Sequence, residues 1–547
     1  MIMAPMGNMF GTEDGEVTQR LIDYYSARAK GGAALIMVQI TQVDGRHLYP
    51  FQPRLDDARY LLGMKRLAEA IHSDGVPIIV QLHHGGPNAY PPISPSGVPC
   101  LTQFAGIVVP KVMSLKEVEE TRDLFIEAAV RAKQAGFDGV ELAGQANYLL
   151  GQFFSPRMNV RIDQYGMSLE NRMRLALEIM RGIRQKCGPD FVVGYGLVVD
   201  ELMPGGTTTE ESIPFAKALE QEGADFIDIR VGTHETFVTT ERSRGHSNHQ
   251  SRTGIWEYSE LFKRGLKVPV FCSTSGCYDP VLWERALEKG RADIIQIAKP
   301  FLCDPELPKK VLENRLEDIR QCILCLFCLD LETRGRQTSC NINPELGREK
   351  EYAIKRTDHS KEVWVVGGGP GGLEAARIAA LRGHKVTVME KKAELGGNLP
   401  ILGLSMGNDL YMDFRDWLVR QCTKAGVKFE LSKEVTLQVI KEAKPDVVIV
   451  ATGAPIPVIP PIPGIKKKHV VTPVDVLTGR VPVGKNVVVV GGSLIGIDTA
   501  YTIAAKGLAE RITIVEPKPV PVVAYDMSVL CRTYMLMVLL PKYGVKG

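Results

Sequence analysis

The first 300 residues alternate short apolar runs with longer amphipathic stretches. Eight runs are almost continuously apolar and rich in β-branched residues, a pattern typical of strands buried on both faces of a parallel sheet. We expect these strands at Ile2–Met6, Ala33–Ile40, Pro77–His83, Gly139–Gly144, Phe191–Val199, Asp225–Gly232, Val268–Thr274 and Asp293–Lys299.

Helical periodicity fills most of the intervals between these runs. The spacing predicts helices over Ser114–Ala135 and Leu169–Lys186. Ser114 with Glu117 three residues later forms the pattern of a capping box, in which each side chain satisfies a free backbone N–H of the first turn. Eight strands separated by helices indicate an α/β chain that begins with a (β/α)8 TIM barrel.

Residues with reactive side chains fall where a barrel of this kind carries its site. Met6 follows the first strand, Gln81 lies on the third, Tyr148 follows the fourth and His234 follows the sixth. The carboxyl ends of barrel strands and the loops after them form one face, and that face holds the active sites of such barrels. We therefore expect these residues to lie together.

A second pattern begins at Glu362, where an apolar strand leads into a glycine loop and a helix. The loop carries GxGxxG at Gly367, Gly369 and Gly372, and the next strand ends in Glu390. The glycines permit a tight turn, close approach of backbone to a pyrophosphate and packing of helix on strand, while the acid can bond a ribose hydroxyl. This combination predicts a Rossmann-like dinucleotide unit.

The same pattern returns near residue 485. Gly491 and Gly496 flank a loop whose middle glycine is replaced by Ser493, and the strand that follows ends at Glu516. Two nested units suggest FAD in the first and a nicotinamide in the second. A carboxylate at Glu516 repels a 2′-phosphate, which predicts NADH over NADPH.

Composition excludes several classes of protein. A chain of 547 residues is too long for one core, so two or three domains are expected. The formal charge of +3 gives no support for a nucleic-acid partner. We find no run long enough to span a membrane and no signal peptide, so we expect a cytoplasmic protein with no membrane partner. In that compartment, the 11 cysteines are expected to be thiols or metal ligands rather than disulfides.

Four cysteines have the spacing of a metal centre. Cys322, Cys325 and Cys328 lie within seven residues, and Cys340 follows. Zinc sites usually use two separated CxxC pairs, so three clustered thiols with one distant partner favour a 4Fe–4S cluster. Zinc, or a coincidence of buried cysteines, remains the alternative.

With these parts in this order, the chain resembles the old yellow enzyme superfamily in its long iron–sulfur form. The markers are Ala4-Pro5-Met6, the segments 148–156 and 163–172, Lys299-Pro300 with the cysteines, and Gly396-Gly397. The family includes 2,4-dienoyl-CoA reductase, 2-enoate reductase, trimethylamine dehydrogenase and bile-acid-inducible oxidoreductases. The resemblance implies three parts: an FMN-type TIM barrel at 1–318, an iron–sulfur segment with linker at 319–358, and a nested FAD/NAD(P)-binding module at 359–547.

The resemblance also implies roles for single residues. Tyr148 matches the proton donor of dienoyl-CoA reductase, His234 matches the histidine that assists it, and Arg157 matches an arginine that contacts substrate. His83 and His84 are more typical of residues that orient a loop, so no catalytic role is predicted for them. Contacts to FMN are implied for Ala4, Pro5, Met6, Gln81, Ser275, Gly276 and Lys299, and contacts to the nucleotides for Gly397 and Asn398.

Some positions depart from the family pattern. Ala143 and Ala146 stand where relatives have a substrate-binding pair, which argues against simple enone binding and against amine oxidation. Gly196 stands where relatives have an arginine beside the flavin, which brings FMN retention and potential into question. The chain also ends partway through the second nucleotide unit of the family, so we expect either a truncated product or incomplete FAD and NADH sites.

The sequence therefore predicts an NADH-dependent ene-reductase that contains FMN, FAD and a 4Fe–4S cluster. It would reduce the C=C bond of an α,β-unsaturated carbonyl compound: an enoate, an enoyl-CoA or a steroid-like enone. The partners expected are this small molecule and NADH, and a homo-oligomer is compatible with the resemblance. The alternatives are an amine dehydrogenase of the trimethylamine dehydrogenase type and a degenerate flavoprotein without turnover.

Overall fold

The computed structural model describes residues 1–102, 106–145, 147–236, 255–274, 276–453, 461–519 and 523–546. The chain divides into two compact units. The barrel unit comprises Met1–Asn314 and Leu326–Glu351, and the nucleotide unit comprises Arg315–Cys325 and Tyr352–Gly547. No helix in the described part of the chain combines the length and the apolar character that a membrane span requires.

Eight parallel strands close into the predicted TIM barrel. Their order around the barrel is β1-β12-β11-β10-β9-β8-β3-β2, so every strand pairs with the next barrel strand along the chain. The strands are β1 (Ile2–Met3), β2 (Ile36–Gln42), β3 (Ile78–His83), β8 (Gly139–Gly144), β9 (Val192–Asp200), β10 (Phe226–Val231), β11 (Val270–Ser273) and β12 (Ile294–Ile297).

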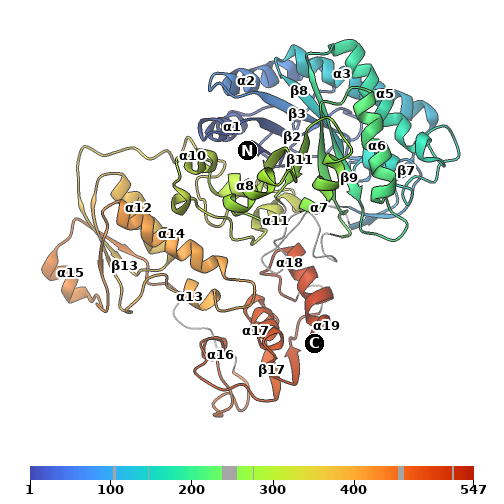
Figure 1. Cartoon of the computed structure of the whole chain (residues 1–547). Helices are drawn as coiled ribbons and strands as arrows, with labels where there is room; N and C mark the ends of the chain where they lie inside the picture. The colour runs from blue at the N-terminus through green and yellow to red at the C-terminus, as the bar shows by residue number, and fades with distance from the viewer. Residues whose placement is uncertain are drawn as a thin grey trace. The chain divides into compact units, whose positions relative to one another are not determined.

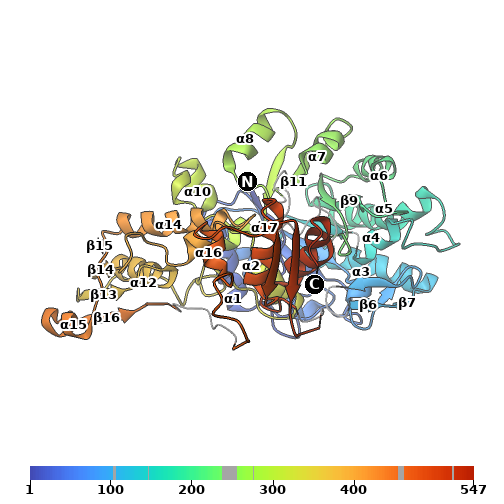
Figure 2. The same cartoon turned by 90° about the horizontal axis from the view of Figure 1, so that it is seen from below.

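Helices cover the outside of the barrel, as Figure 1 shows for α3, α5 and α6. Helices α5 and α6 lie side by side in both views (Figures 1 and 2). The helices of this unit are α1 (Gln19–Lys30), α2 (Leu61–His72), α3 (Leu115–Gln134), α4 (Leu149–Phe154), α5 (Leu169–Cys187), α6 (Thr209–Gln221), α7 (Trp256–Lys263), α8 (Pro280–Glu288), α9 (Lys299–Cys303), α10 (Leu307–Leu312) and α11 (Phe327–Thr333). Two small ladders, β4 (Ile93–Ser94) with β7 (Lys111–Val112) and β5 (Cys100–Thr102) with β6 (Gly106–Val108), lie between β3 and α3 along the chain.

The start of α3 confirms the predicted capping box. Ser114 is the N-cap, and its hydroxyl accepts a hydrogen bond from the backbone N–H of Glu117. The Glu117 carboxylate accepts in return from the Ser114 backbone N–H at 2.8 Å. Two donors that a helix end leaves free are thus satisfied.

The interior of the barrel is apolar at its amino-terminal end. Inward-pointing side chains of five strands form a buried cluster, in which the rings of Phe226 and Phe271 stack at 4.2 Å. Two residues further along β2, β3, β10 and β11 the inward side chains are polar, because side chains on one face recur with period two. The apolar cluster is Ile2, Met37, Ile79, Phe226 and Phe271.

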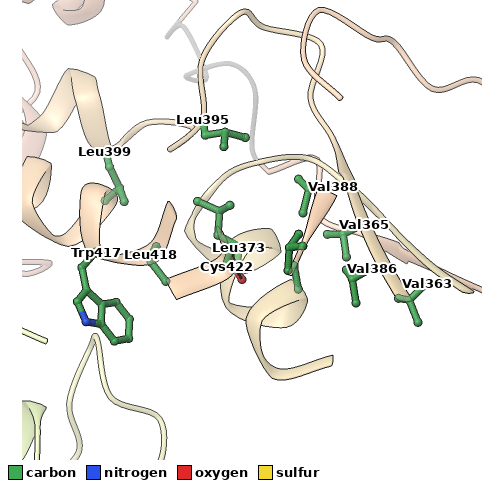
Figure 3. Packing of buried hydrophobic residues seen from close by; sticks show 12 residues of the cluster. Val363, Val365, Leu373, Val386, Val388, Leu395, Leu399, Trp417, Leu418 and Cys422 are labelled. Carbon is green, nitrogen blue, oxygen red and sulfur yellow. Dashed lines mark hydrogen bonds between the residues drawn. The ribbon is translucent and has the colours of Figure 1, made fainter. Parts of the chain in front are cut away.

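The nucleotide unit contains the predicted Rossmann-like sheet. Four parallel strands run in the order β15-β14-β13-β16, with α12 and α14 side by side (Figure 1). Figure 3 shows the core formed by the sheet and these two helices. Valines of β13 and β14 pack there with Leu373 of α12 and with Trp417, Leu418 and Cys422 of α14. The elements are β13 (Glu362–Val366), α12 (Pro370–Leu381), β14 (Lys385–Met389), α13 (Leu399–Leu402), α14 (Leu410–Lys424), β15 (Lys428–Glu430), α15 (Leu437–Ala443) and β16 (Val447–Val450).

The repeat of this pattern near residue 485 also forms. Strands β17 and β18 pair in parallel, and α17 connects them. The elements of this part are α16 (Pro473–Leu477), β17 (Asn486–Val490), α17 (Leu494–Ala505), β18 (Arg511–Val515), α18 (Val529–Tyr534) and α19 (Leu540–Lys542).

Candidate functional site

A layer of buried polar side chains lies inside the barrel above the apolar cluster. The Gln81 amide donates to the Glu141 carboxyl, and Arg230 pairs with Asp228. Gln296 also donates to Asp228, with Nε2 to Oδ2 at 2.9 Å. These five residues are at most 6% exposed. Buried polar groups in such number are expensive unless they serve a ligand or one another.

Charge in this layer is only partly balanced by Arg230. Burial raises the pKa of Glu141 well above its usual value, and the nearby Asp228 carboxylate raises it further, while Arg230 opposes both effects. Burial and Asp228 thus favour the protonated form of Glu141, and Arg230 favours the ionised form.

Gly196 lies against this layer without a side chain of its own. It lies on β9 and pairs in register with Asp228 on β10. A Cβ placed on Gly196 would meet Glu141 Oε1 at 3.0 Å and Gln145 Nε2 at 3.4 Å. The oxygen of the Gln145 side chain is buried and accepts no hydrogen bond within the described structure. A side chain at 196 would thus point into the barrel interior, toward Glu141.

Aromatic side chains gather at the carboxyl ends of the strands. Tyr148, the N-cap of α4, is 9% exposed. Its ring meets the ring of His83 edge-on at 4.3 Å between centroids, and the ring of His234 at 6.1 Å. A side-chain hydrogen bond links it to Tyr49. The structure thus brings together the two residues predicted from the resemblance, Tyr148 and His234.

His83, for which the sequence predicts no catalytic role, also belongs to this group. It is fully buried, and neither ring nitrogen has a hydrogen-bond partner within the described structure. Burial, with a smaller effect of His84, holds the pKa of His83 well below its usual value, so the imidazole is neutral. The signal in the sequence was its position two residues after Gln81 on an otherwise apolar strand, which places both on the inner face.

Arg157 lies in an acidic surrounding. Its Nη2 is 2.9 Å from Glu235 Oε2, and its Nε is 3.7 Å from Glu201 Oε2. Burial raises the pKa of Glu201, while Arg157 opposes that shift. Arg157 pairs with Glu235, the residue that follows His234, so it lies near the carboxyl ends of the barrel strands. Its guanidinium is already bound to a carboxylate in the structure.

The other residues expected to contact FMN lie at the same ends of β1, β11 and β12. Ala4 is buried directly after β1, and Pro5 and Met6 are half-buried. Gly276 adopts φ +89°, a conformation that favours glycine. Lys299 is the first residue of α9, after β12. Ser275 lies outside the described residues.

The first glycine loop has the geometry that its sequence predicts. Gly367 has φ +113°, and a Cβ there would meet Ala451 O at 2.2 Å. A Cβ on Gly372 would meet Gly367 O at 2.0 Å, whereas one on Gly369 meets only Gly397 Cα, at 3.8 Å. The space at Gly369, at the start of a 12-residue helix, fits a pyrophosphate.

Glu390 and the second glycine pair complete this loop. Glu390 Oε2 accepts from Gly368 N at 2.8 Å, and Oε1 accepts from Lys392 N at 2.9 Å. Gly397 has φ +61°, and a Cβ there would meet Gly369 Cα at 2.9 Å. Asn398 follows as the exposed N-cap of α13.

The second loop repeats the first. Glu516 Oε2 accepts from Gly492 N at 2.7 Å, and Oε1 accepts from Lys518 N at 3.1 Å. Ser493, the N-cap of α17, has φ −75°, a conformation open to every residue, so the replaced glycine costs no strain. At the start of α17, Leu494 N donates to Asp526 Oδ1 at 2.9 Å. A carboxylate therefore occupies a helix end that suits a phosphate.

The cysteines have the donor chemistry of a cluster site. Cys322 is buried and its sulfur accepts from Leu324 N at 3.4 Å, whereas Cys325, Cys328 and Cys340 are half-buried. In the barrel unit, Cys303 Sγ lies 3.7 Å from Cys340 Sγ, a neighbour that spacing did not reveal. The described residues hold no group of three His, Cys, Asp or Glu side chains at metal-binding distance, so the 4Fe–4S site stays a prediction from spacing.

Comparison with family models matches both halves of the chain. Residues 1–318 match the NADH:flavin oxidoreductase / NADH oxidase family. Residues 361–535 match the pyridine nucleotide-disulphide oxidoreductase family.

Relatives match over nearly the full length. The chain is 40% identical to an NADH oxidase of Thermoanaerobacter brockii, over 98% of this chain and 83% of that protein. It is 35% identical to a cinnamate reductase of Clostridium sporogenes, over 94% of this chain and 80% of that protein. A solved 2-naphthoyl-CoA reductase in complex with 2-naphthoyl-CoA is 33% identical, with a TM-score of 0.93 over 100% of this chain and 84% of that chain.

Proposed function

Because the chain belongs to the NADH:flavin oxidoreductase / NADH oxidase family, we propose that it reduces the C=C bond of an α,β-unsaturated carbonyl compound. The chain is an NADH-dependent flavoprotein oxidoreductase. The finer assignment, an ene-reductase for an enoate, an enoyl-CoA or a steroid-like enone, rests on one observation. The ring of a buried tyrosine, Tyr148, lies edge-on to the rings of His83 and His234 at the carboxyl ends of the barrel strands.

The chain's own residues provide places for each cofactor. The FMN site is assigned to Gln81, Ala4, Pro5, Met6, Gly276 and Lys299 in the barrel. The FAD site is assigned to the loop at Gly367–Gly372 with Glu390, Gly397 and Asn398, and the NADH site to the loop at Gly491–Gly496 with Glu516. A 4Fe–4S cluster is assigned to Cys322, Cys325, Cys328 and Cys340, in the segment 319–358. When bound, these groups carry electrons from NADH to the substrate, to which FMN supplies hydride.

Tyr148 is assigned the proton-transfer step. Hydride addition at the β carbon leaves charge on the carbonyl side, and the α carbon must then receive a proton. The Tyr148 hydroxyl is a suitable donor because its proton can be replaced along the hydrogen bond to Tyr49. His234, with its ring facing Tyr148, assists by orienting the phenol.

Substrate chemistry is supported by the names of two relatives. Cinnamate is an α,β-unsaturated carboxylate, and 2-naphthoyl-CoA carries a ring double bond conjugated to a thioester. Arg157 offers a cation for the carbonyl or carboxylate end. Its pairing with Glu235 means that a substrate must compete for the guanidinium or share it.

The test is anaerobic turnover of cinnamate and of crotonyl-CoA with NADH, with the reduced product identified by mass spectrometry. Tyr148→Phe keeps the ring and removes the proton, so we expect turnover to fall by at least about 100-fold. Bleaching of the flavin band by NADH should be unchanged in this variant, because Tyr148 does not act in that half-reaction.

The matched control is Tyr165→Phe, whose hydroxyl bonds Glu178 on α5 and lies outside the proposed site. Turnover should stay at the wild-type rate in this control. Equal turnover in Tyr148→Phe and wild type would remove Tyr148 from catalysis. Oxidation of a methylated amine without NADH, with no reduction of either enoate, would replace the ene-reductase proposal by amine dehydrogenation.

A further inference from the structure

Among the described residues of the eight barrel strands, Arg230 is the one Lys or Arg. It points inward from β10 and is 6% exposed. Its Nη2 pairs with Asp228, while its Nε is buried and has no hydrogen-bond partner within the described structure. A guanidinium with a free buried donor at the carboxyl end of a barrel strand has capacity to bind an acceptor.

Gly196 explains why this cation can stand there. The absence of a side chain at Gly196 leaves room for the carboxyl group of Glu141 and the amide of Gln145, because a Cβ at that position would lie 3.0 Å from Glu141 Oε1. Arg230 lies near the same Glu141, whose proton affinity it lowers, and Glu141 in turn bonds Gln81. The positive charge near Gln81 therefore comes from Arg230 on β10, and Gly196 on the neighbouring strand β9 contributes no side chain.

We propose that Arg230 is the cation that faces the pyrimidine edge of FMN in this protein. The inference rests on the proposed FMN site. When bound, FMN would take up two electrons and one proton if a cation stabilises the negative charge left on the ring, and a second proton otherwise. Electrons come from NADH, which leaves as NAD⁺.

Arg230 would stabilise that negative charge, and Asp228 and Gln296 would fix the orientation of its guanidinium. Gln296 and Arg230 share Asp228 as their acceptor, so the guanidinium is held at a fixed place rather than on a mobile side chain. Without it, the layer would present the carboxyl groups of Asp228 and Glu141 to the flavin and no cation.

The test is spectroelectrochemical titration of bound FMN in wild type, Arg230→Gln and Arg230→Lys. We expect the midpoint potential to shift to lower values in Arg230→Gln and to be partly restored in Arg230→Lys, which keeps charge without the fork. FMN affinity of the flavin-free protein, followed by fluorescence quenching, should fall by roughly tenfold or more in Arg230→Gln. The number of protons taken up with two electrons near neutral pH should rise from one to two.

Arg28→Gln is the matched control. Arg28 is fully buried on α1 and paired with Glu349, outside the polar layer of the barrel, so its loss should lower stability without moving the potential. Equal shifts of potential in both variants, or none in Arg230→Gln, would overturn the proposal. Wild-type protein that binds no FMN would overturn both this inference and the proposed function, whereas FMN binding with an unshifted Arg230→Gln would overturn the inference alone.

Discussion

At the scale of single residues, His83 combines full burial with unmet hydrogen-bonding capacity. Its two ring nitrogens have no partner in the described structure, and its ring contacts Tyr148 edge-on. An unsatisfied buried polar group costs about 1–3 kcal/mol. Such a cost is compatible with selection when a substrate or product satisfies the group during turnover.

We expect His83→Phe to raise the free energy of unfolding of the flavin-free protein by about 1 kcal/mol, because the phenyl ring keeps the edge contact and removes the polar atoms. Enoate turnover should fall by roughly tenfold, since the neutral imidazole beside Tyr148 is lost. Denaturant titration and steady-state assay measure the two effects. His72→Phe, on the outer helix α2, should show neither, and a more stable His83→Phe with full turnover would contradict the functional part.

Asp498 provides a second test at this scale. It lies on α17, accepts from Asn408 Nδ2 at 2.9 Å, and burial raises its pKa to about 6. A carboxyl whose pKa is raised on folding stabilises the folded state below its unfolded pKa, and this contribution is lost as the pH rises through about 6.

We expect wild type to lose about 2 kcal/mol of stability relative to Asp498→Asn between pH 4.5 and 7.5, at about 1.4 kcal/mol per pKa unit. The variant carries a neutral amide at all pH values and should lack this dependence. Urea denaturation at a series of pH values measures the difference. Parallel curves for the two proteins would show that Asp498 titrates normally.

At the scale of elements, the two nucleotide loops place a carboxylate in the same way. Glu390 and Glu516 each accept from a backbone N–H of the glycine loop and from a backbone N–H two residues further on. The bond from Gly492 and that from Lys518 lower the pKa of Glu516, so it is ionised at neutral pH. A fixed negative charge at the end of β18 opposes a second phosphate.

We expect NADH to be preferred over NADPH in kcat/KM for flavin reduction, and Glu516→Gln to reduce the preference by roughly tenfold. Stopped-flow reduction with each nucleotide measures the ratio. Glu390→Gln, with the same contacts in the first loop, should weaken FAD retention and leave the ratio unchanged. Equal or better turnover of wild type with NADPH would refute the assignment.

Element boundaries show where sequence patterns are sufficient. The strand Gly139–Gly144 matches its prediction at both ends, and α5 ends one residue beyond its prediction. The predicted strand Ile2–Met6 is shorter in the structure, ending at Met3, because Pro5 has no N–H to donate to a ladder. The predicted strand Asp293–Lys299 ends at Ile297, because Lys299 and Pro300 begin α9.

At the scale of the whole molecule, the chain forms two units with separate cores. Inward side chains of the strands form the core of the barrel. The cluster of Figure 3 forms the core of the Rossmann-like sheet and its helices. A ligand stabilises the unit that binds it by about 2.7 kcal/mol when its free concentration is 100 times Kd. Each flavin is therefore expected to stabilise the unit that binds it.

We expect FMN added to flavin-free protein to raise the melting temperature of one calorimetric transition and FAD to raise that of another, each by several degrees. Differential scanning calorimetry with each flavin alone measures the shifts. A single transition moved equally by either flavin would contradict independent sites.

The sequence by itself determined the elements, their order and the two nucleotide loops. Periods of two and 3.6 residues, glycine positions and capping residues are local, and each predicts an element wherever it occurs. Only the tertiary structure decided which strand supplies the cation inside the barrel. Arg230 and Gly196 are 34 positions apart in the sequence, on neighbouring strands, and the pairing of β8, β9 and β10 brings Gly196 beside Glu141 and Arg230 near it. The burial of His83 and its ring contact with Tyr148 depend on atoms that meet only after folding, which no local pattern encodes.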